Sequence, residues 1–396
     1  MKPLSTTSPV SRDLLCFSHL RWNFVFQRPQ HLLTRAARSF TVHFWEEPRV
    51  EAVAEPRLES CQVAPGIRVL VPVLPADSDP RTHDRMQQDL LEGYMARCCP
   101  APVVAWYYTP MALGFTSHLD LPVCVYDCMD ELSGFAGAPP QLRARERQLM
   151  KRADLVFTGG YSLYEAKRSL HSAAYPFPSS IDVEHFSPAR SGDLRAPHEV
   201  ALLDGPRIGY FGVIDERLDV DLVDELASLR PDWQIVMIGP VVKIDPAKLP
   251  KRDNIHWLGG KPYASLPAYL SAFDVGFMPF ARNAATRYIS PTKTPEFLAA
   301  GLPVVSTPIV DVVRSWGAEG LVEIADTAEA TVDAIERLLA RGPSPEWRAC
   351  VDARLASSSW DQTWADMSKH VAAVARKRIV TRDTVEVRSI AQVSHV

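Results

Sequence analysis

Short apolar runs alternate with longer amphipathic stretches along the 396-residue chain. Continuous apolar runs predict strands buried on both faces, and apolar residues recurring every three or four positions predict helices. In the first half this pattern predicts strands at 13–20, 40–47, 67–74, 103–108, 122–130 and 154–160. It predicts helices at 28–40, 80–97, 111–118, 139–153 and 161–170. Strands that alternate with helices indicate a parallel sheet covered on both faces.

A second series of the same kind follows residues 176–200, which are rich in Pro, Ser and charge and lack periodicity. Strands are predicted at 207–214, 233–240, 254–260, 275–280, 303–307 and 321–325. Helices are predicted at 220–229, 263–273, 294–301 and over most of 327–378. The fold class is therefore α/β, with two doubly wound, Rossmann-like domains whose strand ends face each other across a cleft.

This organisation predicts five segments along the chain. An N-terminal domain occupies 1–190, a linker 191–204 and a C-terminal domain 205–360. A helix at 361–380 is expected to pack back on the N-terminal domain, and the polar tail at 381–396 to be poorly ordered or an edge strand.

Composition narrows the class of protein. The chain is 46% hydrophobic and 23% charged with net charge −4, which is typical of a soluble protein. This balance does not indicate the excess of positive charge that nucleic-acid-binding proteins use. Its seven cysteines are an odd number without paired CxxC spacing, which favours a reducing cytoplasm. No signal peptide is evident, and no window approaches the ~20 apolar residues of a membrane span.

The cation-rich segment 143–152 has two interpretations: a solvated helix face, or a surface that contacts anionic lipid headgroups at the inner membrane. The sequence leaves the oligomeric state open.

The segment SPTKTPEFLAAG, 290–301, predicts a short helix just after a strand and a loop. Thr294 is a good N-cap, Pro295 fits the first helical position and Gly301 fits the end. Such a helix start favours phosphate, and Lys293 adds a positive charge beside it.

Further groups in this segment suit the rest of a nucleotide. The hydroxyls of Ser290 and Thr292 are neutral donors, and Glu296 could accept hydrogen bonds from a ribose. The alternative is that capping alone explains this composition.

Other strand ends in the second half also combine glycine with a nearby cation. These residues are Gly212 with Arg217, Gly239 with Lys243, and the glycine pair before Lys261. Together these residues suit a small anionic ligand that lies across the sheet edge. The alternative for each pair is that glycine and a cation are simply common in loops.

The second half resembles the donor-binding domain of nucleotide-sugar glycosyltransferases of the two-Rossmann-domain GT-B architecture. The resemblance rests on RIGYFGVIDER, WQIVMIGP, NIHWLGGKPYASLPAYLSAFDVGFMPF and SPTKTPEFLAAGLPVVST, in order and spacing over 205–325. The first half, in SHLRWNFVFQRPQHLL and VYDCMDELSGF, is similar to a subgroup that makes bacterial surface polysaccharides, such as teichuronic-acid-type transferases.

The chain departs from the family pattern at the first glutamate of its Glu-x7-Glu motif. Glu296 matches the second glutamate, which in the family binds the ribose, but Tyr288 occupies the first position. Val213 stands at the usual arginine place, so the phosphate clamp is expected to use Arg217, Lys243 and Lys293. The missing glutamate leaves retention or inversion of the anomeric centre open.

The first half offers candidates for a general base. VYDCMDELSGF places Asp127, Asp130 and Glu131 directly after a strand, where one carboxyl could have a raised pKa. We expect Asp130, then Asp127, to act as base or to orient the acceptor, with Glu131 binding it. The alternative is that these carboxylates cap the following turn.

The segment after the first strand should line the same cleft. His19 is another candidate base, and Arg21, Trp22 and Gln27 are expected to bind the acceptor, with aromatic faces suited to sugar rings. The alternative for the aromatic residues is packing beneath a loop.

The resemblance implies transfer of a hexosyl unit from a nucleotide sugar, most simply UDP-linked, to a glycan, lipid-linked or small-molecule acceptor. No further cofactor and no metal are expected. An epimerase of the same architecture and a non-catalytic nucleotide-sugar-binding relative remain alternatives, whereas the absence of G-x-G-x-x-G after either first strand argues against a dehydrogenase.

Overall fold

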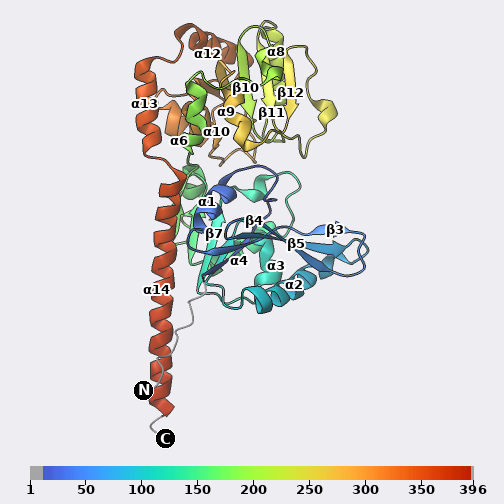
Figure 1. Ribbon diagram of the computed structural model, residues 1–396, viewed down its shortest axis with the longest axis vertical. Coiled ribbons are helices and arrows are strands. Elements are labelled where there is room, and N and C mark those ends of the chain that lie inside the picture. Colours follow the sequence, from blue (N-terminus) through green and yellow to red (C-terminus); the bar gives the residue numbers. More distant parts are fainter. Residues whose placement is uncertain (1–11, 394–396) are drawn as a thin grey trace.

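The chain folds into two α/β domains stacked end to end, with one long helix running alongside the N-terminal domain (Figure 1). The computed structural model describes residues 12–393, with side chains described for residues 12–378. The predicted α/β class is confirmed.

A nine-stranded, mostly parallel sheet forms the N-terminal domain in the order β3-β5-β2-β1-β6-β7-β8-β9, with β4 paired to β5. Its strands are β1 (Asp13–Phe17), β2 (Thr41–Trp45), β3 (Arg49–Glu51), β4 (Arg57–Ala64), β5 (Ile67–Pro75), β6 (Val104–Tyr107), β7 (Val123–Cys128), β8 (Leu155–Thr158) and β9 (Ala174–Pro176). Its α-helices are α1 (Arg28–Ala36), α2 (His83–Cys98), α3 (Leu113–Thr116), α4 (Leu142–Arg152) and α5 (Tyr161–Lys167). The first strand lies inside the sheet and the chain winds outward on both sides of it, which is the predicted doubly wound arrangement.

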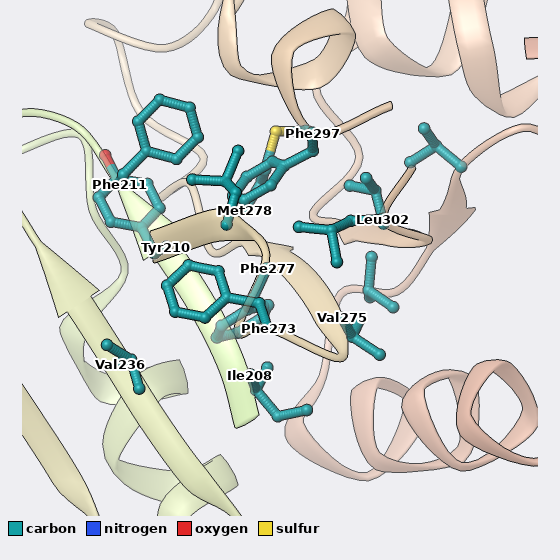
Figure 2. Close-up of a cluster of buried hydrophobic side chains, with 14 of the residues drawn as sticks. Ile208, Tyr210, Phe211, Val236, Phe273, Val275, Phe277, Met278, Phe297 and Leu302 are labelled. Atoms are coloured by element: carbon teal, nitrogen blue, oxygen red, sulfur yellow. The ribbon is translucent and has the colours of Figure 1, made fainter. Parts of the chain in front are cut away.

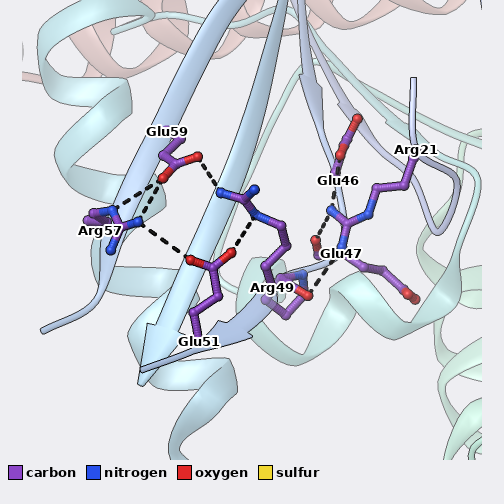
Figure 3. Close-up of polar contacts among 8 residues, drawn as sticks. Arg21, Glu46, Glu47, Arg49, Glu51, Arg57 and Glu59 are labelled. Atoms are coloured by element: carbon purple, nitrogen blue, oxygen red, sulfur yellow. Dashed lines mark hydrogen bonds and ion pairs between the residues drawn. The ribbon is translucent and has the colours of Figure 1, made fainter. Parts of the chain in front are cut away.

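The strands β3 and β4 are not predicted by the sequence pattern. β4 pairs antiparallel with β5, so the sheet is not entirely parallel. Both strands expose charged side chains, and ion pairs join Arg49 and Arg57 to Glu51 and Glu59 (Figure 3). An edge strand of this kind has no apolar run, because much of its surface stays in water.

A six-stranded parallel sheet forms the C-terminal domain in the order β12-β11-β10-β13-β14-β15. The strands are β10 (Arg207–Phe211), β11 (Gln234–Ile238), β12 (Ile255–Gly259), β13 (Val275–Met278), β14 (Val304–Ser306) and β15 (Glu323–Ile324). The α-helices are α8 (Val220–Leu229), α9 (Leu266–Leu270), α10 (Lys293–Ala299), α11 (Val310–Val312) and α12 (Ala328–Arg341). This strand order is that of a dinucleotide-binding Rossmann sheet.

The core of this domain fixes the position of α10 (Figure 2). Phe297 of α10 packs edge-on against Phe211 of β10, with 4.9 Å between ring centroids. Gly276 of β13 makes this contact possible, because a Cβ at that position would lie 2.8 Å from the Phe297 ring. Packing beneath the helix therefore holds its first turn at the carboxyl ends of β10 and β13.

The passage between domains lies earlier than the predicted linker 191–204. Beyond β9, Ile181 and Phe186 already belong to the hydrophobic core of the C-terminal domain. The short helices α6 (Val183–Phe186) and α7 (His198–Ala201) therefore pack on that domain. The proline- and serine-rich composition suggested a loose junction, but Ile181, Phe186 and Val200 are buried in that core.

The chain returns to the N-terminal domain through α13 (Pro345–Ala356) and α14 (Trp360–Val393). Trp360, Trp364 and Met367 of α14 are buried among side chains from β1, β2 and α1. Asp361 accepts hydrogen bonds from Arg35 at 2.8 Å and Arg38 at 2.7 Å. The helix continues to Val393, where the sequence suggested a poorly ordered segment or an edge strand.

Candidate active site

A cavity of about 730 Å³ lies between the two domains, within the usual size range of ligand pockets of ~300–1,000 Å³. Its walls come from the segments that follow β1, β7 and β8 and from those that follow β10, β11, β12 and β13. The carboxyl ends of the two sheets therefore share one cavity, as predicted. Several predicted site residues line it, namely Trp22, Gln27, Asp130, Gly212, Arg217, Gly239, Lys261, Ser290, Thr292, Lys293 and Glu296.

The N-cap of α10 lies two residues before its predicted position. Thr292 occupies the N-cap position and Lys293 is the first helical residue, so the prediction that Thr294 caps the helix is wrong. Thr294 is fully buried, and its hydroxyl contacts the sulfur of Met278 at 3.5 Å. Gly301 follows the helix with φ +80°, which agrees with its predicted role at the end.

Lys293 brings an unpaired positive charge to the cavity. Its ammonium makes no ion pair or hydrogen bond with any residue whose side chain the structure describes, and it lies 5.9 Å from the centre of the Phe211 ring. Burial lowers the pKa of Lys293, and the nearby carboxyl of Glu296 opposes this shift. A partly buried ammonium of this kind favours a bound anion.

Glu296 lies one turn along the same helix and is 6% exposed. Burial raises the pKa of its carboxyl from 4.5 to about 7, although Lys293 acts in the opposite direction. The first turn of α10 thus presents the cavity with a cation and with a carboxyl that titrates near neutrality.

Two glycines make room for this arrangement. A Cβ on Gly212, which has φ +141°, would lie 1.9 Å from Cε of Lys293. A Cβ on Gly239 would lie 1.7 Å from the carbonyl oxygen of Gly212. The structure shows that Gly212 clears the path of the lysine side chain. That Gly212 lets a ligand approach the backbone stays a prediction.

Arg217 lines the cavity but is partly committed to its neighbour Asp215. Its Nε and Nη2 atoms donate to the two carboxylate oxygens at 2.9 and 2.7 Å. Although burial acts in the opposite direction, this bidentate pair raises the pKa of Arg217. Nη1 makes no hydrogen bond with the described side chains or backbone, so one edge of the guanidinium is left for a ligand.

The other predicted cations of the C-terminal domain have carboxylate partners. Lys243 lies outside the cavity lining, 3.7 Å from Glu216 and 4.7 Å from the ring centre of Phe135 in the N-terminal domain. Lys261 lines the cavity, but its ammonium is 2.7 Å from Glu199. Of the predicted clamp, Lys293 is therefore the cation that makes no ion pair in the part of the chain that the structure describes.

The candidate bases in the N-terminal domain are in different environments. Asp127 is fully buried in β7, and both of its oxygens accept hydrogen bonds from Arg28, the shortest at 2.9 Å. It is therefore outside the cavity. Asp130 follows the end of the strand and lines the cavity; burial raises its pKa, while Arg217 and Arg28 oppose the shift.

His19 lies near the cavity but outside its lining. Burial, followed by the charge of Lys243, lowers the pKa of His19 to about 4. Its Nδ1 atom is buried without a hydrogen-bond partner in the described structure.

Two predicted acceptor-binding residues are held elsewhere. Glu131 is 2.6 Å from Lys167, and although burial acts in the opposite direction, hydrogen bonds from Lys167 and Ser133 lower its pKa. Arg21 donates to Glu46 at 3.0 Å and to the carbonyl of Glu47 (Figure 3). Both side chains are thus used in local ion pairs and lie outside the cavity lining.

The other two predicted acceptor-binding residues, Trp22 and Gln27, line the cavity. Trp22 packs edge-on against Phe44, and its backbone N–H donates to Glu46 at 2.8 Å. Gln27 is the N-cap residue of α1.

The sequence did not predict the contact between Tyr263 and Phe26, which meet across the cavity. Their rings stack with 4.5 Å between centroids, one from each domain. It also missed Asp215 as the partner of Arg217. The spacing of two residues could have suggested this pair, but no local signal links Tyr263 to Phe26.

A separate group of potential metal ligands lies at the start of β1 and β2, away from the cavity. One ligand atom from each of Asp13, His43 and Cys99 lies within 4.8 Å of the others. His43 is already hydrogen-bonded on both ring nitrogens, to Tyr94 at 2.7 Å and to Asp13 at 2.9 Å. Burial raises the pKa of Cys99 to about 12. The hydrogen bonds of His43 therefore account for its position in this group without a further ligand.

Comparison with known sequences finds similarity in the C-terminal domain to one family. Residues 205–341 match the family described as "Glycosyl transferases group 1". The chain is also 27% identical over 229 residues to the "Putative teichuronic acid biosynthesis glycosyltransferase TuaH" of Bacillus subtilis (strain 168). That match covers 53% of this chain and 55% of the relative, so it spans about half the length of the curated protein. The resemblance predicted from the sequence is confirmed.

Solved structures with the same fold cover nearly the whole chain. Sucrose-phosphate synthase from Thermosynechococcus elongatus has a TM-score of 0.62 at 15% identity, covering 96% of this chain and 100% of its own. The trehalose 6-phosphate synthase from Burkholderia multivorans has a TM-score of 0.65 at 12% identity, covering 93% and 100%. The E. coli trehalose-6-phosphate structure bound with UDP-2-fluoro glucose has a TM-score of 0.65 at 12% identity, covering 91% and 98%. The fold is GT-B, as predicted.

Within residues 12–393, the structure contains no helix whose length and hydropathy would allow it to span a bilayer.

Proposed function

We propose that this protein is a glycosyltransferase that moves a hexosyl unit from a nucleotide sugar to an acceptor hydroxyl. The observation that carries the proposal is the unpaired ammonium of Lys293 beside Glu296 in the cavity between the domains. A diphosphate would supply the counter-charge that the ammonium lacks, and the ionised carboxyl of Glu296 would accept hydrogen bonds from a ribose. A nucleotide sugar contains both groups.

The chemistry follows from the two walls of the cavity. Breaking the bond between the anomeric carbon and the diphosphate oxygen leaves negative charge on that oxygen, where Lys293 and the free edge of Arg217 stabilise it. The new bond forms to the acceptor oxygen, whose proton passes to Asp130 on the opposite wall. We assign no step to a metal ion.

Two finer parts of the proposal rest on the comparisons. A UDP-linked donor is supported by the UDP-2-fluoro glucose in the E. coli structure. A role in bacterial surface polysaccharide synthesis, with a glycan or lipid-linked acceptor, is supported by the name of the B. subtilis relative. Such a role would place the protein in the cytoplasm, with peripheral contact at the inner membrane through the cation-rich α4 (Leu142–Arg152).

A non-catalytic nucleotide-sugar-binding protein is a second candidate, favoured by Tyr288. This residue replaces a family glutamate, and its ring packs against the core of the N-terminal domain instead of lining the cavity. Donor turnover separates the two candidates.

The test begins with a thermal-shift screen of UDP-, GDP- and dTDP-sugars, because a ligand that binds only the folded state raises the melting temperature. Calorimetry with UDP then compares the wild type with Lys293→Ala and with Lys248→Ala, an exposed lysine in the same domain. Loss of charge-assisted bonds should weaken binding by about 1.5–3 kcal/mol in the first variant alone.

Equal UDP affinity in Lys293→Ala and the wild type would contradict the assignment. Catalysis is then assayed as release of UDP from UDP-glucose, with and without a neutral glycoside. UDP binding without any turnover would support the non-catalytic candidate.

A further inference from the structure

The acceptor side of the cavity combines apolar and polar side chains, and its apolar part is concentrated in one segment. The segment after β1 contributes Trp22, Phe24, Val25 and Phe26 to the lining. Phe24 and Phe26 are exposed, at 43% and 41%. Large exposed aromatic side chains that line a cavity indicate a contact surface for a ligand.

Only one of the three rings lacks a structural role. Trp22 packs against Phe44 at 5.1 Å, and Phe26 stacks on Tyr263 of the other domain. Phe24 makes no ring contact with any residue in the range 12–378, although its backbone N–H is anchored to the carbonyl of Arg21 at 3.2 Å. The loop is therefore fixed, while the Phe24 ring remains open to a ligand.

Among the described residues that line the acceptor side of the cavity, no positively charged side chain is free to bind an acceptor phosphate. Arg28 uses Nε and Nη2 on Asp127, and its Nη1 donates to the carbonyl of Phe177 at 2.7 Å. The other ionisable group of the wall is the carboxyl of Asp130, which would repel an anion. Lys293 lies on the opposite wall, where the proposed function uses it for the donor diphosphate.

We propose that the acceptor is an uncharged glycoside with an apolar aglycone, held by Phe24, and that sugar phosphates are excluded. The inference rests on the proposed function, since it names the acceptor class of that same site. The ring carbons and the apolar group of such a molecule pack on the aromatic face, while its free hydroxyl points to Asp130.

The test uses three probes with the same sugar: octyl β-glucoside below its micelle concentration, glucose and glucose 6-phosphate. Each is titrated by calorimetry into the full chain with and without UDP. We compare the wild type with Phe24→Ala, Phe24→Tyr and Leu229→Ala, the last a 46% exposed apolar residue on α8.

The wild type should bind octyl β-glucoside at least about tenfold more tightly than glucose 6-phosphate. Loss of the ring in Phe24→Ala should weaken that binding about three- to tenfold, whereas Phe24→Tyr and Leu229→Ala should bind as the wild type does. UDP affinity should be the same in all four proteins.

Tighter binding of glucose 6-phosphate, or octyl β-glucoside binding that is indifferent to Phe24→Ala, would overturn the acceptor assignment. Failure of the wild type to bind UDP would instead remove the proposed function. Because the glycoside titrations are also run without UDP, the two failures are distinguishable.

Discussion

Asp127 and Asp130 show how position at a strand end separates two identical side chains. Asp127 is the fifth residue of β7 and points into the domain, where it is fully buried against Arg28. Asp130 lies just beyond the strand and lines the cavity. The first carboxylate is therefore suited to hold Arg28 and the start of α1, and the second to meet an acceptor hydroxyl.

We predict opposite signatures for the two asparagine variants. Asp130→Asn should retain UDP affinity and melting temperature but lower turnover by about 10²- to 10⁴-fold, the usual contribution of a general base. Asp127→Asn should lower the free energy of unfolding by about 3–5 kcal/mol, because it leaves the buried guanidinium of Arg28 uncompensated. Chemical denaturation and steady-state kinetics check both, and normal turnover in Asp130→Asn would remove that residue from the mechanism.

Glu296 should make nucleotide binding dependent on pH. Its pKa is raised by burial to about 7, so the carboxylate that can accept two ribose hydrogen bonds is lost as pH falls through neutrality. Calorimetry with UDP-glucose should show weaker binding at pH 6 than at pH 8. Glu296→Gln should bind weakly at both values, and an unchanged pH profile in that variant would contradict the assignment.

The stability of the unliganded protein should respond in the opposite sense. A carboxyl whose pKa is higher in the folded state stabilises the fold below its unfolded pKa of 4.5, and this stabilisation is lost as pH rises through about 7. The melting temperature of the wild type relative to Glu296→Gln should therefore fall between pH 5 and pH 8. A constant difference over this range would mean that Glu296 does not titrate there.

At the scale of elements, the sequence was informative where a local signal exists. Apolar runs located β10, β11, β13 and β14, and strand ends placed Lys293 and Glu296 in the cavity. The cap of α10 was misjudged because tertiary packing buries Thr294, whose residue type alone favours capping.

The remaining misses depend on contacts distant in sequence. Glu131 pairs with Lys167 and Asp127 with Arg28, and no spacing along the chain announces either pair. The same holds for Phe26 and Tyr263, which come from different domains. The sequence alone can therefore place a carboxylate at a strand end, but it does not show whether that carboxylate is already paired with a cation from elsewhere in the chain.

The turn after β10 offers a test of how an element positions the site. In Gly212→Ala, the new Cβ would meet Cε of Lys293 at 1.9 Å, so the lysine must move. Gly259→Ala is the matched control, since Gly259 also has positive φ, +68°, but has open space around its Cβ position. Each variant should lose about 1 kcal/mol of stability through backbone strain, while only Gly212→Ala should also lose UDP affinity. Equal UDP affinity in both variants would show that the clearance at Gly212 does not set the lysine position.

At the scale of the whole molecule, the two domains are joined by contacts around the cavity as well as by the chain. Phe135 of the N-terminal domain lies 5.3 Å from the guanidinium of Arg217. Ser179 donates to the carbonyl of Ser290 at 2.7 Å. These contacts hold the donor and acceptor walls in the relative position that transfer requires, because reacting groups must approach within bond-forming reach.

The most buried of these polar contacts joins Asp311 at the start of α11 to the backbone N–H of Ser162 in α5, at 2.9 Å. Asp311→Ala leaves that buried N–H without its acceptor, which should weaken the coupling between domains by about 1–3 kcal/mol.

Arg314→Ala is the matched control, because Arg314 and Glu165 connect the same two regions through a 3.1 Å pair that is exposed on both sides. An exposed pair contributes about 0–1 kcal/mol, so its loss should change little. Scanning calorimetry should show broader or separated transitions for Asp311→Ala and a single wild-type-like transition for Arg314→Ala. Identical traces for the two variants would mean that packing alone, including the Phe26–Tyr263 stack, holds the domains together.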